Sequence, residues 1–391
     1  MTNPNIYYLN TLFDLEIGAL DSSGVRRSAA EMSVLAIPFA KKNDYALLDI
    51  DIEDNYLDYL KECGLEVPSI YGNSRCIDGC SGVAWGWSEQ AMEKLKDAGA
   101  VCDCPPIEII KKVNSRKFCN ELGRQYGLGV PGSIYLESNQ ELYSLSALLQ
   151  DFPLVIKPAY GGSGHGFTIL NSKDDIPKAD VGRGAVIEPW MTRVCDLSTA
   201  VVIDKCGKIV KMRHQRLFCN SHGAFFGIYL SKRDPEIDKW RENMETAAVL
   251  ASLALYKEGY FGPAGFDAFV YKGKNRVHLA PVIEINARHV MSDIADALRT
   301  QLAPENHVFF RFVSRRNMRV PLSYDEWLTI MGSDVYNPDT KQGVICVSPL
   351  KARIDGRWLF LSRYAFFLSA ESESELFAMD ERLRKKIKGT D

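Results

Sequence analysis

The chain has 391 residues, of which 46% are hydrophobic and 25% are charged, and its formal net charge is −3. This near balance excludes a whole-protein field that attracts nucleic acid or an anionic membrane. No run approaches the ~18–20 apolar residues of a membrane span, and the N-terminus lacks a cationic segment followed by an apolar core. We therefore expect a cytoplasmic protein of two or three domains, without nucleic-acid or membrane partners.

Residues 1–110 are expected to form a small open α/β domain. A helix opens at Ser88, whose hydroxyl suits an N-cap, and Gly99 stops it. Alternation of short β-prone runs with helical spacing indicates a parallel sheet. The other predicted elements are strands at 6–9, 45–50 and 83–87 and a helix at 55–62 that ends at Cys63-Gly64.

A second unit begins after the break at Cys104-Pro105-Pro106. Beyond residue 151 the spacing favours strands joined by short turns, which indicates a mainly antiparallel sheet. We expect domains at 1–110, 111–190, 191–320 and 321–391. The predicted elements are helices at 114–126, 236–256 and 372–388, strands at 154–157, 167–170, 185–188, 198–204, 209–212, 264–271 and 280–285, and two strands around Asp355-Gly356.

An apolar run ending in Lys157 leads into a glycine-rich loop with Gly161, Gly162, Ser163 and Gly164. A loop almost without Cβ atoms folds tightly over a polyphosphate and presents backbone N–H donors, while the lysine supplies a cation. Tight turns explain most such loops without a ligand. Together with the distant acidic residues described below, however, this loop indicates ATP.

The segment Glu188-Pro189-Trp190-Met191 follows a predicted strand and precedes Asp196. An ATP site needs a backbone hinge beside the adenine edge, apolar walls, and a carboxylate that accepts the ribose hydroxyls. We expect Glu188 and the backbone beside Trp190 to serve the adenine, and Asp196 to serve the ribose. Taken alone, a strand that ends in Glu-Pro-Trp is ordinary.

Three oxygen-bearing side chains lie on two neighbouring predicted strands. Glu284 and Asn286 are two residues apart, so both point to one face of the sheet, and Asp267 lies on the strand before. Carboxylate and amide oxygens suit Mg²⁺, and also Mn²⁺. We therefore predict that this set holds the metal of a nucleotide triphosphate.

Two arginines are candidate catalytic groups. Arg288 either neutralises Glu284 or stabilises charge that develops on a transferred phosphoryl group or acyl phosphate, and we favour the second role. Arg213, or its neighbour Arg216, lies on a cationic predicted strand and is expected to bind anionic substrate or triphosphate. The alternative for this strand is a solvated sheet edge.

Ten cysteines are scattered along the chain. The spacings Cys76-x-x-x-Cys80 and Cys102-Asp103-Cys104 do not match a paired zinc pattern, and histidines are absent nearby. We expect free thiols, most of them buried as small apolar groups.

The order of these parts resembles that of the ATP-grasp superfamily over about residues 110–300. The resemblance rests on 114–117 with Val130-Pro131, the Lys157 strand and loop, Glu188 to Asp196, Asp267, and 284–288. It implies an N-terminal open α/β domain, two α+β subdomains that hold ATP between them, and a small C-terminal strand and helix element.

For individual residues, the resemblance implies that Lys157 and one of Arg116 or Lys117 contact the phosphates. It assigns adenine to 188–191, ribose to Asp196 and Mg²⁺ to Asp267, Glu284 and Asn286. Several ligases of this superfamily have an arginine where this chain has Phe266, which leaves anion stabilisation to Arg288 or Arg213. Carboxylase relatives are disfavoured, since the last 90 residues do not resemble the extension of a biotin enzyme.

We expect an ADP-forming ligase that joins a small-molecule carboxylate to an amine, of the amino-acid or peptide ligase type. Its chemistry needs positioning and electrostatics rather than a protein nucleophile. The alternatives are a kinase that phosphorylates a hydroxyl on the same scaffold and a nucleotide-binding module without catalysis, which we disfavour because the metal carboxylates are present. A homo-oligomer is compatible with the sequence.

Overall fold

The N-terminal part of the chain forms a four-stranded parallel sheet in the order β4-β2-β1-β5. The computed structural model describes residues 3–72, 79–146, 149, 152–161, 166–220 and 223–388. The parallel pairing confirms the open α/β prediction. The strands are β1 (Asn5–Tyr8), β2 (Tyr45–Leu47), β4 (Ser69–Ile70) and β5 (Ser81–Ala84), and the helices are α1 (Phe13–Ile17), α2 (Arg26–Met32), α3 (Ala36–Phe39), α4 (Asp54–Glu62) and α5 (Glu89–Asp97).

Local sequence signals set the longer helices of this region. Ser88 caps α5 by accepting a hydrogen bond from the Ala91 N–H at 3.1 Å. Gly64 follows α4 with a φ of +87°, which ends that helix as predicted. The prediction missed α1, α2 and α3, because elements of four to seven residues carry little periodicity.

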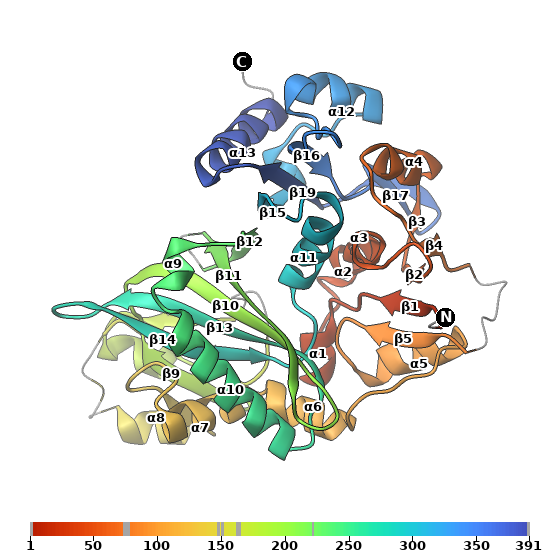
Figure 1. The fold of residues 1–391 in the computed structure, drawn as a ribbon. Coiled ribbons are helices and arrows are strands. Elements are labelled where there is room, and N and C mark those ends of the chain that lie inside the picture. The colour runs from red at the N-terminus through yellow and green to blue at the C-terminus, as the bar shows by residue number, and fades with distance from the viewer. Residues whose placement is uncertain are drawn as a thin grey trace.

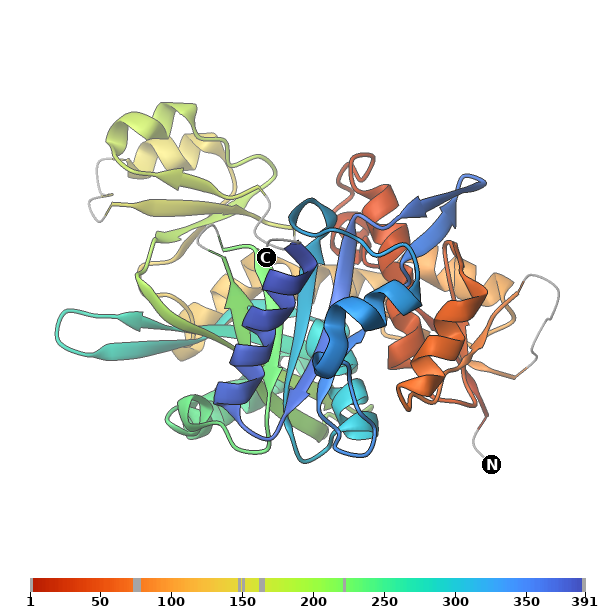
Figure 2. The same ribbon diagram turned by 90° about the horizontal axis from the view of Figure 1, so that it is seen from above.

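A second, antiparallel sheet has the order β6-β9-β7-β8 and its own apolar core, which includes Leu142, Ile156 and Ile187. Figure 2 shows this unit standing apart from the rest of the molecule. Its elements are β6 (Ile134–Leu136), α8 (Asn139–Leu145), β7 (Leu154–Pro158), β8 (Thr168–Leu170) and β9 (Ala185–Pro189). Helices α6 (Ile107–Asn114) and α7 (Arg116–Tyr126) precede this unit, and their buried apolar residues belong to the largest apolar cluster of the protein.

The largest sheet has eight strands in the order β14-β13-β10-β11-β12-β15-β19-β16, and all of its neighbours are antiparallel. This confirms the antiparallel prediction. Its strands are β10 (Arg193–Ile203), β11 (Ile209–Cys219), β12 (Phe225–Leu230), β13 (Gly262–Lys272), β14 (Val277–Asn286), β15 (His307–Ser314), β16 (Gly343–Cys346) and β19 (Arg363–Ala370). Its helices are α9 (Pro235–Asp238), α10 (Arg241–Lys257), α11 (Met291–Leu302), α12 (Tyr324–Met331) and α13 (Glu373–Lys388).

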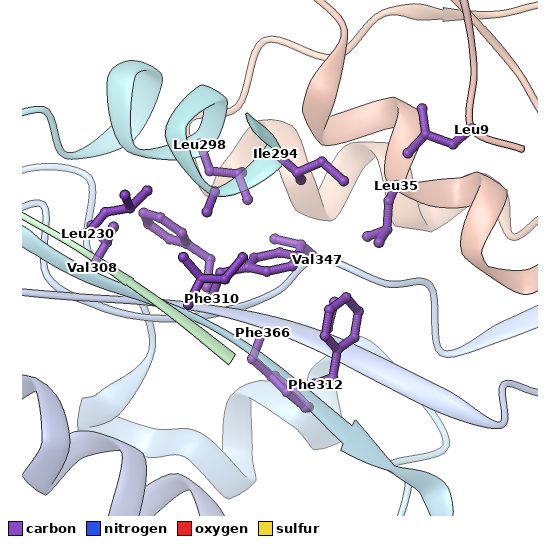
Figure 3. Close-up of a cluster of buried hydrophobic side chains, with 14 of the residues drawn as sticks. Leu9, Leu35, Leu230, Ile294, Leu298, Val308, Phe310, Phe312, Val347 and Phe366 are labelled. Atoms are coloured by element: carbon purple, nitrogen blue, oxygen red, sulfur yellow. The ribbon is translucent and has the colours of Figure 1, made fainter. Parts of the chain in front are cut away.

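Helix α11 joins the N-terminal part to the large sheet (Figure 1). Its buried side chains Ile294 and Leu298 lie between Leu35 of the N-terminal helices and Phe310 of β15, as Figure 3 shows. These residues belong to one continuous apolar cluster. Burial of each such side chain contributes about 1.5–3 kcal/mol, so α11 fixes the two parts relative to each other.

The C-terminal hairpin of β17 (Lys351–Ile354) and β18 (Arg357–Phe360) returns to the N-terminal part. Asp355 and Gly356 both have positive φ, 49° and 77°, as a tight hairpin turn requires. Strand β17 pairs with β3 (Asp51–Ile52), a short strand from the first part of the chain. The predicted strand pair therefore forms, and it completes a sheet with β3. Across the described ranges, the helices are all too short or too polar to cross a membrane.

Candidate active site

One face of the large sheet carries the predicted metal residues, together with Asp196 and Arg213. Across the strands, Ser198 lies opposite Asp267, which lies opposite Glu284, and Gly265 lies opposite Asn286. Residues directly opposite each other in a ladder share a face. The predicted metal residues are therefore brought together at the β13–β14 pair. Asp196 and Arg213 belong to the same face of β10 and β11.

Asp267 is the most perturbed acid of this face. Burial and the neighbouring Glu284 raise the pKa of its carboxyl to about 7, while hydrogen bonds from Ser198 and Asn286 act in the opposite direction. The Asn286 amide donates to Asp267 Oδ2 at 3.1 Å. A buried carboxyl that resists ionisation is stabilised by a nearby cation.

The donor set of this face fits Mg²⁺. Two carboxylates and one amide oxygen are within the two or three protein ligands that Mg²⁺ usually takes. Within the described ranges, no group of three His, Cys, Asp or Glu side chains is placed to hold a metal. The Asn286 oxygen currently accepts a hydrogen bond from Arg288 at 2.8 Å, so metal binding would require that oxygen to turn from the arginine.

Arg116 reaches this face from the first turn of α7. Its Nη2 atom lies 2.6 Å from Glu284 Oε1, and its guanidinium also donates to the carbonyls of Pro158 and Gly161 at 2.6 and 3.0 Å. Helix α7 begins here because the Ser115 hydroxyl accepts from the Phe118 N–H at 3.2 Å. The predicted helix start at Asn114 is wrong, since that residue ends α6.

Lys117 points away from the site. Its ammonium lies 2.5 Å from Glu137 Oε1, and both side chains are about half exposed. Of the two alternatives for the phosphate contact, only Arg116 lies beside the predicted metal residues. The helix period distinguishes them, because Arg116 shares its face with buried Cys119, Asn120 and Gly123 at i+3, i+4 and i+7.

Lys157 is buried at the end of β7 and forms an ion pair with Glu188 of β9. Both side chains are less than a tenth exposed. The Phe167 ring lies beside the cations of Lys157 and Arg116, at 5.5 and 5.4 Å from its centroid. Two cations thus converge at the mouth of the glycine-rich loop. Glu188, predicted to serve adenine, directs its carboxylate to Lys157 instead.

The glycine-rich loop is described only in part. Gly161 is described, with a φ of 142°, and its carbonyl accepts from Arg116. The predicted loop residues Gly162, Ser163 and Gly164 lie outside the described residues.

The predicted hinge follows β9. Pro189 lies opposite Leu154, and the Trp190 N–H donates to the Pro153 carbonyl at 2.8 Å, so this N–H is already engaged. Met191 packs against an apolar cluster that includes Val130 and Phe269. This cluster is an apolar wall of the kind that an adenine ring needs.

Asp196 lies on the same face as Ser198, two residues before it on β10. Its carboxylate accepts from Arg193 Nη1 at 2.9 Å. Burial raises the pKa of this carboxyl, and the charges of Arg193 and Lys157 partly offset the rise. The Arg193 guanidinium also lies 4.5 Å from the centre of the Phe269 ring, which ties Asp196 to the apolar wall.

A cavity of about 560 Å³ adjoins these groups. Arg116, Lys157 and Glu188 line it from α7, β7 and β9, and Val282 and Ile283 line it from β14. Its volume lies within the ~300–1,000 Å³ typical of small-molecule sites. The lining combines the charged groups of Arg116, Lys157 and Glu188 with apolar ones, whereas Met191, Asp196 and the predicted metal residues do not line this cavity.

Arg288 links Asn286, one of the predicted metal residues, to the N-terminal part. Its guanidinium donates to both carboxylate oxygens of Asp14 at 3.2 and 2.9 Å and lies over the Trp85 ring at 5.8 Å. The Asp14 carboxylate increases the affinity of this guanidinium for its proton, and the pKa of Arg288 stays above its usual value despite the opposing effect of burial. Glu284 is paired with Arg116 rather than with Arg288.

Arg213 is held by α11 rather than directed to the phosphate end. Its guanidinium donates to Ser292, Asp293 and Asp296 at 2.9, 2.8 and 2.8 Å. The structure therefore does not bring Arg213 into contact with Lys157, Arg116 or the metal residues. Its neighbour Arg216 is paired with Asp234 and Glu373 on the other face.

Sequence reasoning missed Asp14, Ser198 and Phe167. Asp14 lies on the five-residue helix α1, which gives no periodic signal. Ser198 was detectable, because it shares the face of Asp196 at a spacing of two. Phe167 follows the glycine-rich loop directly, where an aromatic ring near two cations is a recognisable pattern.

Of the described cysteines, Cys119 lines the cavity. The nine described cysteines are free, and four of them, Cys63, Cys80, Cys119 and Cys346, are buried. Cys76 lies outside the described residues. Burial raises the pKa of the Cys119 thiol to about 12, so it is an inert apolar group.

No family model matches the sequence. One curated relative, the mitochondrial α subunit of methylcrotonoyl-CoA carboxylase from Arabidopsis thaliana, is 24% identical over 196 residues. The match covers 47% of this chain, and the chain spans only 26% of the length of that relative.

Solved structures resemble nearly the whole chain. Phosphoribosylamine–glycine ligase from Thermotoga maritima has a TM-score of 0.60 at 14% identity, and the match covers 98% of this chain and 97% of the other. Biotin carboxylase from Campylobacter jejuni has a TM-score of 0.57 at 13% identity, with 89% and 87% covered.

A carboxyaminoimidazole ribonucleotide synthase from Aspergillus clavatus, complexed with ATP, has a TM-score of 0.53 at 14% identity, with 99% of both chains covered. Carboxylases, which the sequence disfavoured, are thus among the similar proteins, beside ligases that form other bonds. All of these structures share one architecture over the length of this chain. The protein therefore has the ATP-grasp fold.

Proposed function

We propose that this protein is an ADP-forming ligase that uses ATP to join a carboxylate to an amine, of the amino-acid or peptide ligase type. One observation carries the proposal: the cations of Arg116 and Lys157 line one cavity, and Arg116 also pairs with Glu284, which lies opposite Asp267. Two cations beside a pair of acids that can hold Mg²⁺ fit a nucleotide triphosphate.

Each group has a part in this proposal. Lys157 exchanges its ion pair with Glu188 for ATP phosphate oxygens, and Arg116 adds a second cation next to the glycine-rich loop. Asp267, Glu284 and Asn286 would hold Mg²⁺, which supplies charge neutralisation for the phosphates. Met191 borders the adenine, and Asp196 accepts the ribose hydroxyls once it is released from Arg193.

The reaction needs no protein nucleophile. A carboxylate oxygen of the first substrate attacks the γ-phosphorus, and the bond from that phosphorus to the β,γ-bridging oxygen breaks, which releases ADP. The amine nitrogen then attacks the acyl carbon and loses a proton, the C–N bond forms, and inorganic phosphate leaves. In this proposal Arg288, which donates a hydrogen bond to Asn286, is the cation that stabilises the acyl phosphate.

The similar structures support the general reaction class of this proposal but not its substrates. They include a phosphoribosylamine–glycine ligase and a complex with ATP. The composition and the absence of a candidate membrane span in the described residues support a cytoplasmic location. A homo-oligomer is compatible with the sequence, and the proposed function does not depend on it.

A release assay tests the proposed function. Purified protein, ATP and MgCl₂ are combined with pairs of amino acids, and ADP and phosphate are measured by coupled assays. We expect ADP to appear only when a carboxylate and an amine are both present, with a condensed product in the mass spectrum. ADP that forms with bicarbonate and no amine, or a phosphorylated hydroxyl, would assign a carboxylase or a kinase instead.

A further inference from the structure

Helix α10 carries apolar residues on both of its sides. Ala248 and Leu255 on its inner side are buried in the main apolar cluster against the large sheet. Val249, Leu253 and Tyr256 on its outer side are 50, 45 and 38% exposed. A surface helix normally places polar residues on its solvent side. The outer side of α10 is therefore an apolar surface that no described part of the chain covers.

This outer side faces away from the candidate active site. Met244 of the inner side belongs to one apolar cluster with Leu197 of β10 and Ala268 of β13. Side chains alternate between the two faces of a strand, so the neighbouring Ser198 and Asp267 point to the opposite face of the sheet. Figure 1 shows α10 in front of the strands of the large sheet, with no other helix or strand drawn over it. A partner can therefore bind α10 without covering the candidate site.

The exposed residues of α10 follow the spacing of a coiled-coil seam. They succeed one another at intervals of four, three, four and three residues, and we call them the α10 seam: Glu242, Thr246, Val249, Leu253 and Tyr256. This spacing keeps the side chains in one line along the helix, where they can pack between those of a second helix. The pattern therefore indicates that α10 pairs with another helix.

The α10 seam is complementary to itself in the antiparallel direction. Val249 and Leu253 lie two residues on either side of Ala251, so a two-fold axis at the height of Ala251 brings Val249 of one copy opposite Leu253 of the other. The same axis brings Thr246 opposite Tyr256. It also places the partially positive N-terminus of each helix beside the partially negative C-terminus of the other. A second copy of this chain therefore fits the seam.

The two ends of α10 carry opposite charges. Glu242 is in the first turn and Lys257 is in the last turn, and both are exposed. Neither forms an ion pair with any residue that the structure describes. In an antiparallel pair, Lys257 of one copy comes within reach of Glu242 of the other. A parallel pair would instead bring the two Lys257 side chains together, and their like charges repel.

Tyr256 is already held in place at the C-terminal end of the seam. Its ring lies against the turn between β10 and β11, where a Cβ at Gly207 would lie 2.6 Å from the ring. Gly207 has a φ of 81°, which glycine adopts without strain. Because the ring is fixed beforehand, pairing costs little side-chain entropy. Tyrosines of this kind are enriched among the residues that dominate binding energy.

We propose that α10 is the interface of a homodimer, in which the α10 seams of two copies pack antiparallel about a two-fold axis. The dimer goes beyond the proposed function and does not depend on it. With 17 residues, α10 is about 25 Å long, so one helix pair gives an interface at the small end of the range for specific complexes. The dimer therefore dissociates on dilution, and each copy keeps its own candidate site.

Sedimentation velocity on the full chain tests this proposal. We expect a monomer–dimer equilibrium in wild type, with a Kd in the micromolar range. Leu253→Glu should raise this Kd by roughly 30-fold or more, because it places a charge against Val249 of the other copy. Leu322→Glu is the same substitution at a leucine that is 67% exposed and lies outside α10, and it should leave the Kd within about twofold. The proposal is overturned if wild type stays monomeric up to about 500 µM, or if Leu253→Glu dimerises as well as Leu322→Glu.

A charge exchange tests the antiparallel direction. Glu242→Lys and Lys257→Glu should each raise the Kd by about fivefold, because each brings like charges together at both ends of the helix pair. The double variant restores opposite charges and should dimerise like wild type. A double variant with a Kd higher than that of either single variant would overturn the antiparallel arrangement.

Two further measurements separate this proposal from loss of folding and from the proposed function. At concentrations below the Kd, circular dichroism should give the same melting temperature for wild type and all variants, which shows that each is folded. ADP release per subunit should be equal in wild type and Leu253→Glu, since α10 covers the face of the sheet opposite to the candidate site. A ligase without a dimer would overturn only the dimer, and a dimer without ADP release would overturn only the proposed function.

Discussion

Arg116 and Glu284 lie 2.6 Å apart although they are separated by 168 residues in the sequence. One is in the first turn of α7 and the other is on β14, so the ion pair connects the helix beside the glycine-rich loop to the metal face of the large sheet. Arg116 also holds the carbonyls of Pro158 and Gly161. A single guanidinium thus fixes the entrance of the loop against the predicted metal ligands.

Replacement of Arg116 by alanine should lower kcat/KM for ATP by about 100-fold or more, because it removes a cation from the phosphate end. Lys117→Ala is the matched control and should stay within about twofold, since its pair with Glu137 is exposed and worth only about 0–1 kcal/mol. Steady-state ADP release measures both. Equal losses in the two variants would contradict the assignment of Arg116.

Variants of the buried ion pair of Lys157 and Glu188 distinguish an effect on stability from an effect on activity. Lys157→Met should destabilise the protein by about 3–5 kcal/mol, because Glu188 is left buried without its partner. The double variant Lys157→Met, Glu188→Gln should recover most of that loss but still lack ATP turnover. Urea unfolding and ADP release are the two measurements. An active double variant would remove Lys157 from the phosphate site.

Glu284→Gln should raise the Mg²⁺ concentration needed for half-maximal activity by about tenfold or more, since it removes one of two carboxylate ligands. An Mg²⁺ titration of ADP release at saturating ATP measures this effect. Glu137→Gln, which removes an exposed acid, is the control. An unchanged Mg²⁺ requirement in Glu284→Gln would exclude Glu284 as a ligand.

The pKa of Asp267, raised to about 7, predicts how metal-free protein responds to pH. Between roughly pH 4 and 7 the folded state holds a proton on this carboxyl that the unfolded state has lost. The free energy of unfolding contributed by Asp267 therefore falls as pH rises through this window, by at most about 1.4 kcal/mol per pH unit.

Urea unfolding in EDTA at pH 5 and pH 7 measures this contribution. Asp267→Asn cannot titrate, so its stability should fall less between the two pH values than that of wild type. Identical pH dependence in the two proteins would show that Asp267 ionises normally.

Leu298→Ala should lower the free energy of unfolding by about 2–5 kcal/mol, because this side chain is completely buried between the N-terminal helices and the large sheet. Leu253→Ala is the same substitution in an α-helix at a position that is 45% exposed, and it should change stability by at most about 0.5 kcal/mol. Chemical denaturation followed by circular dichroism compares them. A small loss at Leu298 would mean that α11 does not hold the two parts together.

Much of the architecture was predictable from local signals. The Ser88 cap, the Asp355-Gly356 turn and the period-two spacing of Glu284 and Asn286 depend only on residues close in sequence. Such signals fix an element and its exposed face before any tertiary contact forms. The expected parallel and antiparallel sheets are confirmed for the same reason.

The contacts between distant segments were not predictable. Arg288 was expected to stabilise a transferred phosphoryl group or acyl phosphate, or else to neutralise Glu284, and its pairing with Asp14 on a helix of only five residues was not foreseen. Arg213 was expected near the phosphates, and instead α11, which was not predicted, captures it. In both cases the partner of the charge is set by tertiary packing, which one sequence does not encode locally. The roles of the individual site residues stay predictions.

The pairing of β3 with β17 also constrains how the chain is made. Tyr56, fully buried beside β3, donates to the carbonyl of Val347, 291 residues later. At about 5–20 residues per second, the ribosome needs roughly 15–60 seconds to supply that partner. Throughout this interval β3 lacks its partner strand and the Tyr56 hydroxyl lacks its acceptor. We therefore expect newly synthesised chains to be substrates for chaperones until the last hairpin emerges, and chaperone depletion during synthesis would test this.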